Sequence, residues 1–287
     1  MSNTKPIWKK VLYERQPYPD NYTDKKIFLR DLRKNINVRE LTFTEAVLGS
    51  LLILQEFCNI VTFVSIYFYL LYEWIEPVVL LTCMSVVTII AFIYYILVFS
   101  KNVIHKLGND LRTIITFIVV GRLFSPVLHT LTDTVSTDTI YTTTFLMMAI
   151  HMIFYDYGVG AAIVSNSVSL STAIFASICL ASRLSTAFNA FILMTAAIEM
   201  FVLFPILCTA LKNPLYFVWI LLIIDIYLLV YLSKLALILY MSTVVLISIV
   251  CPFLFVYLQK HKETIYGPWD EAVVDDVDSI INNFQIL

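Results

Sequence analysis

The chain has 287 residues, of which 60% are hydrophobic and only 14% are charged, with a formal net charge of −2. Soluble domains carry about 25% charged residues, so this composition excludes an ordinary soluble protein. The apolar residues form blocks of about 20, the length that crosses a bilayer core of about 30 Å. The sequence therefore predicts an all-α fold, a polytopic membrane bundle of helices.

The chain begins with a polar arm, residues 1–43, which lacks the apolar stretch of a cleavable signal peptide. Residues 24–40 place Phe28, Leu32 and Ile36 on one face of a helix and basic side chains on the others. This pattern predicts an amphipathic helix that binds an anionic lipid headgroup or docks a partner. A solvated helix without a special role is the alternative. The basic residues are Lys25, Lys26, Arg30, Arg33 and Lys34.

A membrane domain is predicted over residues 44–258, with about eight transmembrane helices. Their approximate ranges are 46–71, 78–99, 112–130, 140–155, 161–181, 187–210, 214–232 and 235–258. Eight spans put both termini on one side of the membrane. Of the 19 Lys and Arg residues, 16 fall on that side, Arg183 and Lys234 on the other, and Arg122 within a span. Positive residues favour the cytosol, so both the arm and the acidic tail, residues 259–287, are expected to be cytosolic.

A polar run, LTDTVSTDTIY at residues 131–141, separates the third and fourth expected spans. Side chains of this kind accept hydrogen bonds from the free N–H groups at a helix start. We therefore expect Thr137, Asp138 or Thr139 to cap the fourth span. A lipid-headgroup or metal site is the alternative interpretation. The polar candidates are Asp133, Ser136 and Asp138 before this span and Asp156 after it.

Small residues recur at every fourth position along the fifth expected span. This spacing makes a smooth face that allows a second helix to approach closely. Packing inside the bundle is the favoured interpretation, and packing against a helix of a separate subunit is the alternative. The residues of this small-residue stripe are Ala161, Ser165, Ser169, Ala173, Ser177 and Ala181.

Five ionisable residues fall inside the expected spans, namely Glu56, Arg122, His151, Glu199 and Asp225. Charges are costly in lipid, so one arginine among several acids indicates an intramembrane ion pair. A proton or ion relay is the functional alternative. It would make the chain a lipid or small-solute transporter or scramblase, which is the second candidate function.

Motifs of enzyme active sites are missing from the sequence, which has no Gly-rich phosphate loop, GxSxG, HExxH or CxxC. The five cysteines all lie in apolar blocks and are read as packing residues. Asp276-Val277-Asp278 matches a nucleotide-sugar motif, but a lone match in an acidic tail is very weak. We expect no catalytic residue, metal, cofactor or nucleic-acid partner.

Five stretches resemble the PIG-C family in colinear order: WKKVLYERQPYPDNYTD (8–24), FSPVLHTLTDTVSTDTIY (124–141), FYDYG (154–158), SLSTAIFASICLASRL (169–184) and GPWDEA (267–272). Members of this family are membrane subunits of the phosphatidylinositol N-acetylglucosaminyltransferase that starts GPI-anchor synthesis. The resemblance implies a complex that transfers GlcNAc from UDP-GlcNAc to phosphatidylinositol at the cytosolic face of the endoplasmic reticulum.

The resemblance also implies that the sugar-nucleotide domain belongs to a different, glycosyltransferase-type subunit. The present chain is then expected to be a non-catalytic, multi-pass component that organises the complex or presents the acceptor lipid. Under this hypothesis the basic arm holds the anionic lipid or docks the catalytic subunit. The small-residue stripe would contact partner helices. Arg122 and Glu199 are not carried over from the family pattern.

Overall fold

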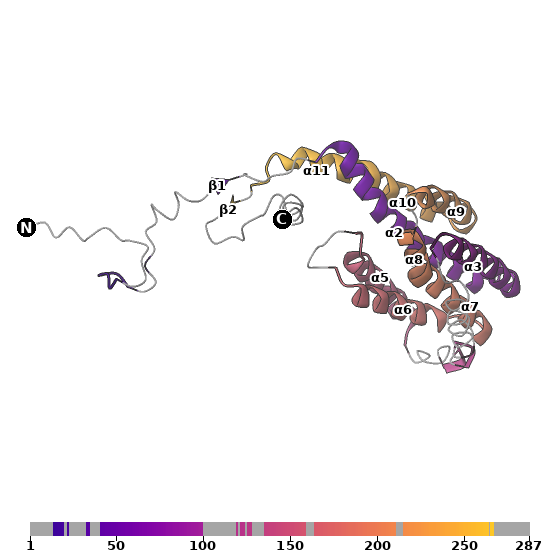
Figure 1. Cartoon of the computed structure of the whole chain (residues 1–287). Helices are drawn as coiled ribbons and strands as arrows, with labels where there is room; N and C mark the ends of the chain where they lie inside the picture. Colours follow the sequence, from indigo (N-terminus) through magenta and orange to yellow (C-terminus); the bar gives the residue numbers. More distant parts are fainter. Residues whose placement is uncertain are drawn as a thin grey trace, which may run out of the picture. The chain divides into compact units, whose positions relative to one another are not determined.

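A computed structural model describes residues 14–19, 22, 33–34, 41–99, 119, 121–123, 125–127, 135–158, 164–210, 215–263 and 265–266. The chain divides into two compact units. One combines Met1–Thr42 with Val256–Leu287, and the other is Phe43–Phe255. The second unit contains the helical bundle (Figure 1).

Helices account for nearly all the secondary structure of the described residues, which confirms the all-α prediction. They are α2 (Phe43–Leu71), α3 (Pro77–Phe99), α5 (Thr137–Phe154), α6 (Asn166–Ala181), α7 (Ala187–Ile198), η1 (Glu199–Leu203), α8 (Phe204–Ala210), α9 (Tyr216–Leu232), α10 (Lys234–Val245), η2 (Leu246–Val250) and α11 (Cys251–Gln259). The segments η1 and η2 are π-helical and continue the helices on either side of them.

Four continuous helices in the described part of the chain are long and apolar enough to cross a membrane. They are Phe43–Leu71, Pro77–Tyr94, Ala187–Cys208 and Lys234–Gln259. Two shorter apolar helices, Asn166–Ala181 and Tyr216–Leu232, have 10–17 residues. These six match six of the expected spans, and α5 coincides with a seventh. Most of the expected third span lies outside the described residues, so the count of eight stays a prediction.

The longest helix, α2, packs against helices on two sides. On one side it contacts α5 and α7, where a core around Phe63, Tyr67 and Leu70 is buried. On the other side it contacts α9 and η2, and a second core surrounds Leu54 and Cys58. Within this unit α5 and α6 lie side by side (Figure 1). Helix α2 therefore carries inward-facing residues over much of its circumference.

Proline follows both π-helical segments at the same distance. Pro205 is two residues after η1 and Pro252 is two residues after η2. Proline has no N–H and its ring clashes with a preceding carbonyl in a regular α-helix. A π turn adds a residue and widens the helix at that point. The geometry thus accommodates each proline without ending the helix.

Three of the helices have a hydroxyl-bearing residue at their N-cap. Ser136 caps α5 by accepting from the Thr139 N–H, Thr186 caps α7, and Ser233 caps α10. Each places a short oxygen acceptor at a helix start, where the first N–H groups have no partner within the helix.

The other unit contains a two-stranded antiparallel sheet of β1 (Arg33–Lys34) and β2 (Ile265–Tyr266). Arg33 pairs with Tyr266 and Lys34 with Ile265. The helix expected over residues 24–40 is therefore wrong at these two residues. Short isolated helices are marginal, and pairing with a distant strand supplies hydrogen bonds that the local pattern did not reveal. Lys25, Lys26 and Arg30 lie outside the described residues.

Candidate functional site

Several deeply buried polar side chains of the bundle meet around Glu56 of α2. His151 of α5 places its Nε2 atom 2.9 Å from Glu56 Oε1. Its other ring nitrogen, Nδ1, lies 2.9 Å from the Ser169 carbonyl oxygen and 2.8 Å from Ser169 Oγ on α6. Glu56 and His151 are each 1% exposed. One imidazole thus joins three helices.

The partners of His151 determine where its protons lie. A main-chain carbonyl only accepts hydrogen bonds, so the Nδ1 atom facing Ser169 O carries a proton. The contact between Nε2 and Glu56 Oε1 then holds one more proton. The pair is either imidazolium with carboxylate or neutral imidazole with carboxylic acid. In either form Nε2 and Oε1 share a hydrogen bond, so neither buried atom is left without a partner. Burial of polar atoms in an apolar bundle requires such a partner.

Asn59, one turn after Glu56 on α2, connects the pair to a fourth helix. Its Nδ2 atom donates to Glu56 Oε1 at 3.2 Å and to the Met200 carbonyl at 3.0 Å. Met200 lies in η1, where the carbonyl of residue i is directed at the N–H of residue i+5. For Met200 that residue is Pro205, which has no N–H. Asn59 therefore supplies the donor that the backbone lacks.

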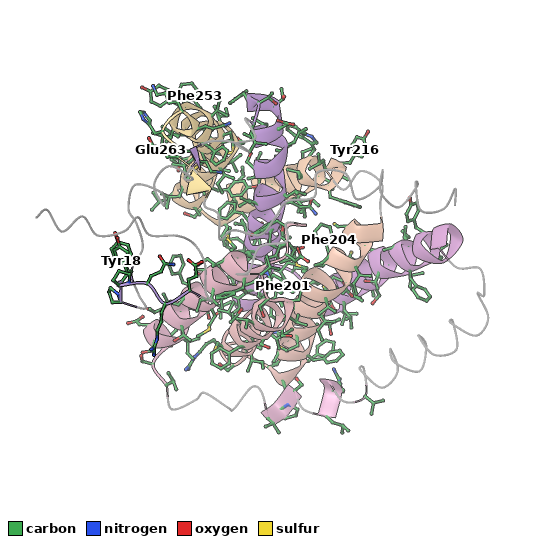
Figure 2. The ribbon with its side chains drawn as sticks, turned by 60° about the vertical axis from the view of Figure 1, so that its left-hand side comes forward. Tyr18, Phe201, Phe204, Tyr216, Phe253 and Glu263 are labelled. Carbon is green, nitrogen blue, oxygen red and sulfur yellow. The ribbon has the colours of Figure 1, made fainter. Side chains whose placement is uncertain are left out.

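We call Glu56, Asn59, His151 and Ser169 the α2 network. Two aromatic rings pack against it, since the His151 ring lies edge-on to Phe201 at 5.1 Å and to Tyr155 at 5.6 Å between centroids. Figure 2 labels Phe201 inside the bundle, whereas Tyr216 and Phe253 project from its outside. Beyond the end of α5, burial is the main cause that raises the pKa of the Tyr157 phenol.

A second buried carboxylate, Asp225 of α9, occupies the opposite side of α2. Thr62 Oγ1 donates to Asp225 Oδ1 at 2.6 Å, and Tyr240 of α10 donates its hydroxyl to Asp225 Oδ2 at 2.9 Å. The Tyr240 oxygen also lies 3.2 Å from Cys58 Sγ. Because the tyrosine proton is directed at the carboxylate, its oxygen accepts from the thiol. We call this group the Asp225 cluster.

Gln55 carries an unsatisfied polar atom beside the α2 network. Its Nε2 atom is 3.0 Å from Cys208 Sγ, whereas the buried Oε1 atom has no hydrogen-bond partner. Exchanging the two amide atoms would pair the oxygen with the thiol and leave the nitrogen unpaired. In both assignments one polar atom of this side chain stays unsatisfied.

The sequence predicted an ion pair between Arg122 and one of the buried acids. For Glu56 this prediction is wrong, because its partner is His151. The guanidinium of Arg122 instead lies over the rings of Phe188 and Phe191, with Cζ 4.7 and 5.5 Å from their centroids. Such pairings depend on which helices are neighbours in the bundle, and the sequence does not show this directly. The partners of Asp225 in the described part of the chain are likewise hydroxyl groups.

Most of the small-residue stripe faces the interior of this chain's own bundle. Ser169 is 3% exposed, and Ala173, Ser177 and Ala181 are fully buried. Ser165 is half-buried at the start of α6 and Ala161 lies outside the described residues. Since α6 packs against α5 and α7, the burial favours internal packing. A separate subunit at this stripe stays a prediction.

The polar candidates around α5 are not brought together into one site. Ser136 is the cap, one residue before the expected Thr137, whereas Asp138 lies exposed in the first turn. Asp156 Oδ1 accepts from the Gly158 N–H at 2.9 Å in a tight turn where Gly158 has a positive φ of 79°. Asp133 lies outside the described residues. Among the described residues, no three His, Cys, Asp or Glu side chains form a metal site.

Three residues of the two buried clusters were missed in the sequence, namely Asn59, Thr62 and Tyr240. Pro205 was the available signal for Asn59, since a proline inside a span leaves a carbonyl without its donor. In both clusters a buried carboxylate is hydrogen-bonded to side chains of other residues, and these contacts connect different helices. The hydrogen-bond geometry of the α2 network also allows a proton to reside on either Glu56 or His151.

The apolar helices and the buried, internally satisfied polar clusters define a class of protein, an all-helical membrane bundle. Comparison with known families goes further. Residues 8–270 match the GPI2 family, described as phosphatidylinositol N-acetylglucosaminyltransferase. The chain belongs to this family, and the resemblance noted in the sequence is confirmed.

Three relatives, each named as a subunit of phosphatidylinositol N-acetylglucosaminyltransferase, illustrate the family. The protein of Homo sapiens is 41% identical over 96% of this chain and 96% of its own length. A relative from Dictyostelium discoideum is 38% identical over 93% of this chain and 79% of its own. The GPI2 protein of Schizosaccharomyces pombe is 28% identical over 93% and 86%. No solved structure matches the chain.

Proposed function

We propose that this chain is a non-catalytic membrane subunit of the complex that transfers GlcNAc from UDP-GlcNAc to phosphatidylinositol. The observation that carries the proposal is the match over nearly the whole chain to relatives named as subunits of phosphatidylinositol N-acetylglucosaminyltransferase. The sequence lacks a glycine-rich phosphate loop, which supports assigning the sugar nucleotide to another subunit.

The buried clusters support a structural role within such a complex. The α2 network connects α2, α5, α6 and η1, and the Asp225 cluster connects α2 with α9 and α10. Fully satisfied buried polar networks fix one arrangement of helices. A rigid bundle is what a subunit needs in order to present a constant surface to partner helices and to an acceptor lipid.

The proposed location is the endoplasmic reticulum membrane, with both termini in the cytosol. The excess of Lys and Arg on the terminal side supports this orientation. The basic residues Lys25, Lys26, Arg30, Arg33 and Lys34 would then lie on the side where UDP-GlcNAc is used. There they would attract phosphatidylinositol or the catalytic glycosyltransferase subunit.

GlcNAc transfer from labelled UDP-GlcNAc to phosphatidylinositol, measured in microsomes depleted of this chain, tests the function. Loss of transfer, with recovery when the chain is added back, is the expected result. Immunoblotting of the glycosyltransferase-type subunit in the same membranes separates lost assembly from lost handling of the acceptor. Full transfer in depleted microsomes would refute the proposal.

The basic arm needs a separate test. Neutralising Arg30, Arg33 and Lys34 together should lower transfer or assembly, because the arm is proposed to supply the positive charge that attracts the lipid or the partner. A matched variant neutralising Lys260 and Lys262, which lie just after α11, controls for loss of charge near the membrane. Unchanged transfer and unchanged assembly in the arm variant would remove this role.

A further inference from the structure

Arg122 is held in a defined position at the start of α7. Its guanidinium lies over the rings of Phe188 and Phe191, in the first two turns of that helix. One turn further along its own helical stretch, the buried Ser125 donates its hydroxyl to the main-chain carbonyl of Ala187. A cation–π contact of Arg122 and a hydrogen bond of Ser125 therefore both hold this segment against the start of α7.

The charge of Arg122 has no counter-charge within the described part of the chain. No hydrogen bond or ion pair joins its guanidinium to a described residue, and the side chain is exposed at the surface of the bundle. The aromatic faces attract a cation but accept none of its five N–H groups as a carboxylate or phosphate would. An anionic oxygen acceptor from outside the described residues would complete the arrangement.

The sequence placed Arg122 in the middle of an expected span, 112–130, but its contacts with Phe188 and Phe191 place it near the end of a candidate span. This depth indicates which acceptor it binds. Helix α7 begins the candidate span Ala187–Cys208, so Phe188 lies in the first turn of that span. Arginine side chains near the ends of spans extend toward the headgroup layer. The amino-terminal end of α7 also carries positive partial charge, which favours an anion at the same place.

We propose that Arg122, seated on Phe188 and Phe191 at the start of α7, binds the phosphate group of a membrane phospholipid. The guanidinium presents paired N–H donors that match two phosphate oxygens. Phosphate is present at this depth in any phospholipid bilayer, so the guanidinium meets this anion without a partner chain. This inference goes beyond the proposed transferase function and does not depend on it.

The full chain, purified and delipidated in detergent, provides the test by native mass spectrometry. The probes are phosphatidylglycerol and a diacylglycerol with the same acyl chains but no phosphate. The variant Arg122→Gln should weaken phosphatidylglycerol binding about tenfold, the scale of a lost charge-assisted contact of about 1.4 kcal/mol. Arg122→Lys should lose less, because it keeps the charge but not the paired donors.

Matched controls make the result specific. Lys234→Gln removes an exposed cation at the start of another helix and should weaken phosphatidylglycerol binding less than Arg122→Gln does. Diacylglycerol should bind all variants alike. Equal phosphatidylglycerol binding by wild type and Arg122→Gln would overturn the proposal, as would equal losses for phosphatidylglycerol and diacylglycerol.

A further outcome distinguishes a protein counter-charge from a lipid one. In detergent-solubilised complexes, loss of another subunit from Arg122→Gln, with unchanged phosphatidylglycerol binding by the isolated chain, would assign Arg122 to a partner carboxylate. That result would overturn the lipid site. If Arg122→Gln is obtained in low yield, the comparison of phosphatidylglycerol binding is made between wild type and Arg122→Lys.

Discussion

The side-chain amide of Asn59 lies 3.0 Å from the carbonyl oxygen of Met200, on a different helix. Met200 is the residue whose main-chain donor in the π register would be Pro205, which has no N–H. The same nitrogen is 3.2 Å from the carboxylate of Glu56. One asparagine thus compensates for a proline and supports the buried acid of the bundle.

Replacing Asn59 by Leu should therefore lower the free energy of unfolding by about 1–3 kcal/mol, because the Met200 carbonyl and Glu56 both lose a buried donor. Thermal unfolding in detergent micelles measures the effect. In a Pro205→Ala background the residue at position 205 regains its N–H, so Asn59→Leu should cost less there. Additive effects of the two substitutions would show that Asn59 and Pro205 are independent.

Removing one member of the Glu56–His151 pair should cost more than removing both. Glu56→Leu leaves a buried imidazole without its acceptor, and we expect a loss of about 3–5 kcal/mol. The double variant Glu56→Leu with His151→Leu should be more stable than the sum of the single variants predicts. Glu56→Gln keeps a hydrogen-bonding group and should be milder than Glu56→Leu. A double variant as unstable as the sum would indicate that the two side chains act separately.

The Asp225 cluster predicts a matched pair of tyrosine variants. Tyr240→Phe removes the hydroxyl that donates to Asp225, so it should destabilise the chain by about 1–3 kcal/mol. Tyr227→Phe alters an exposed tyrosine on the same helix as Asp225 and should change stability by less than about 0.5 kcal/mol. Melting temperatures of the two variants in one detergent give the comparison. Equal values would argue that the Tyr240 hydroxyl contributes nothing.

The orientation with both termini in the cytosol predicts a glycosylation pattern. The native sequon Asn21-Tyr22-Thr23 should stay unmodified in endoplasmic reticulum membranes, because the arm does not enter the lumen. A flexible loop carrying a sequon, inserted after Thr134, should be glycosylated. Gel mobility before and after glycosidase treatment reports both sites. Sugar on Asn21 would reverse the orientation.

Helical architecture could be predicted because it depends on local properties. The ends of α2, α3 and α9 lie within three residues of the expected spans, since apolar length and polar flanks define them. Ser136, adjacent to the expected caps, differs by one residue because several neighbouring hydroxyls suit the role. The strand at Arg33–Lys34 could not be expected, since its partner is more than 200 residues away.

Only part of the candidate site could be predicted from the sequence. Glu56, His151 and Asp225 are conspicuous because ionisable groups are rare in spans. Their partners were assigned by charge alone, which favoured Arg122. The structure pairs the two acids instead with His151, Asn59, Thr62 and Tyr240, and those contacts depend on which helix faces lie opposite each other.

The π segment η1 has a geometric consequence for the helix that contains it. Each residue of an α-helix advances about 100° around the axis, so one extra residue rotates everything that follows by roughly that angle. Before η1, Ala190 and Leu193 belong to the core shared with α6; after it, Cys208 meets Gln55 of α2. A single span therefore presents two differently directed faces in succession, and deleting one residue between 199 and 203 would turn Cys208 away from α2.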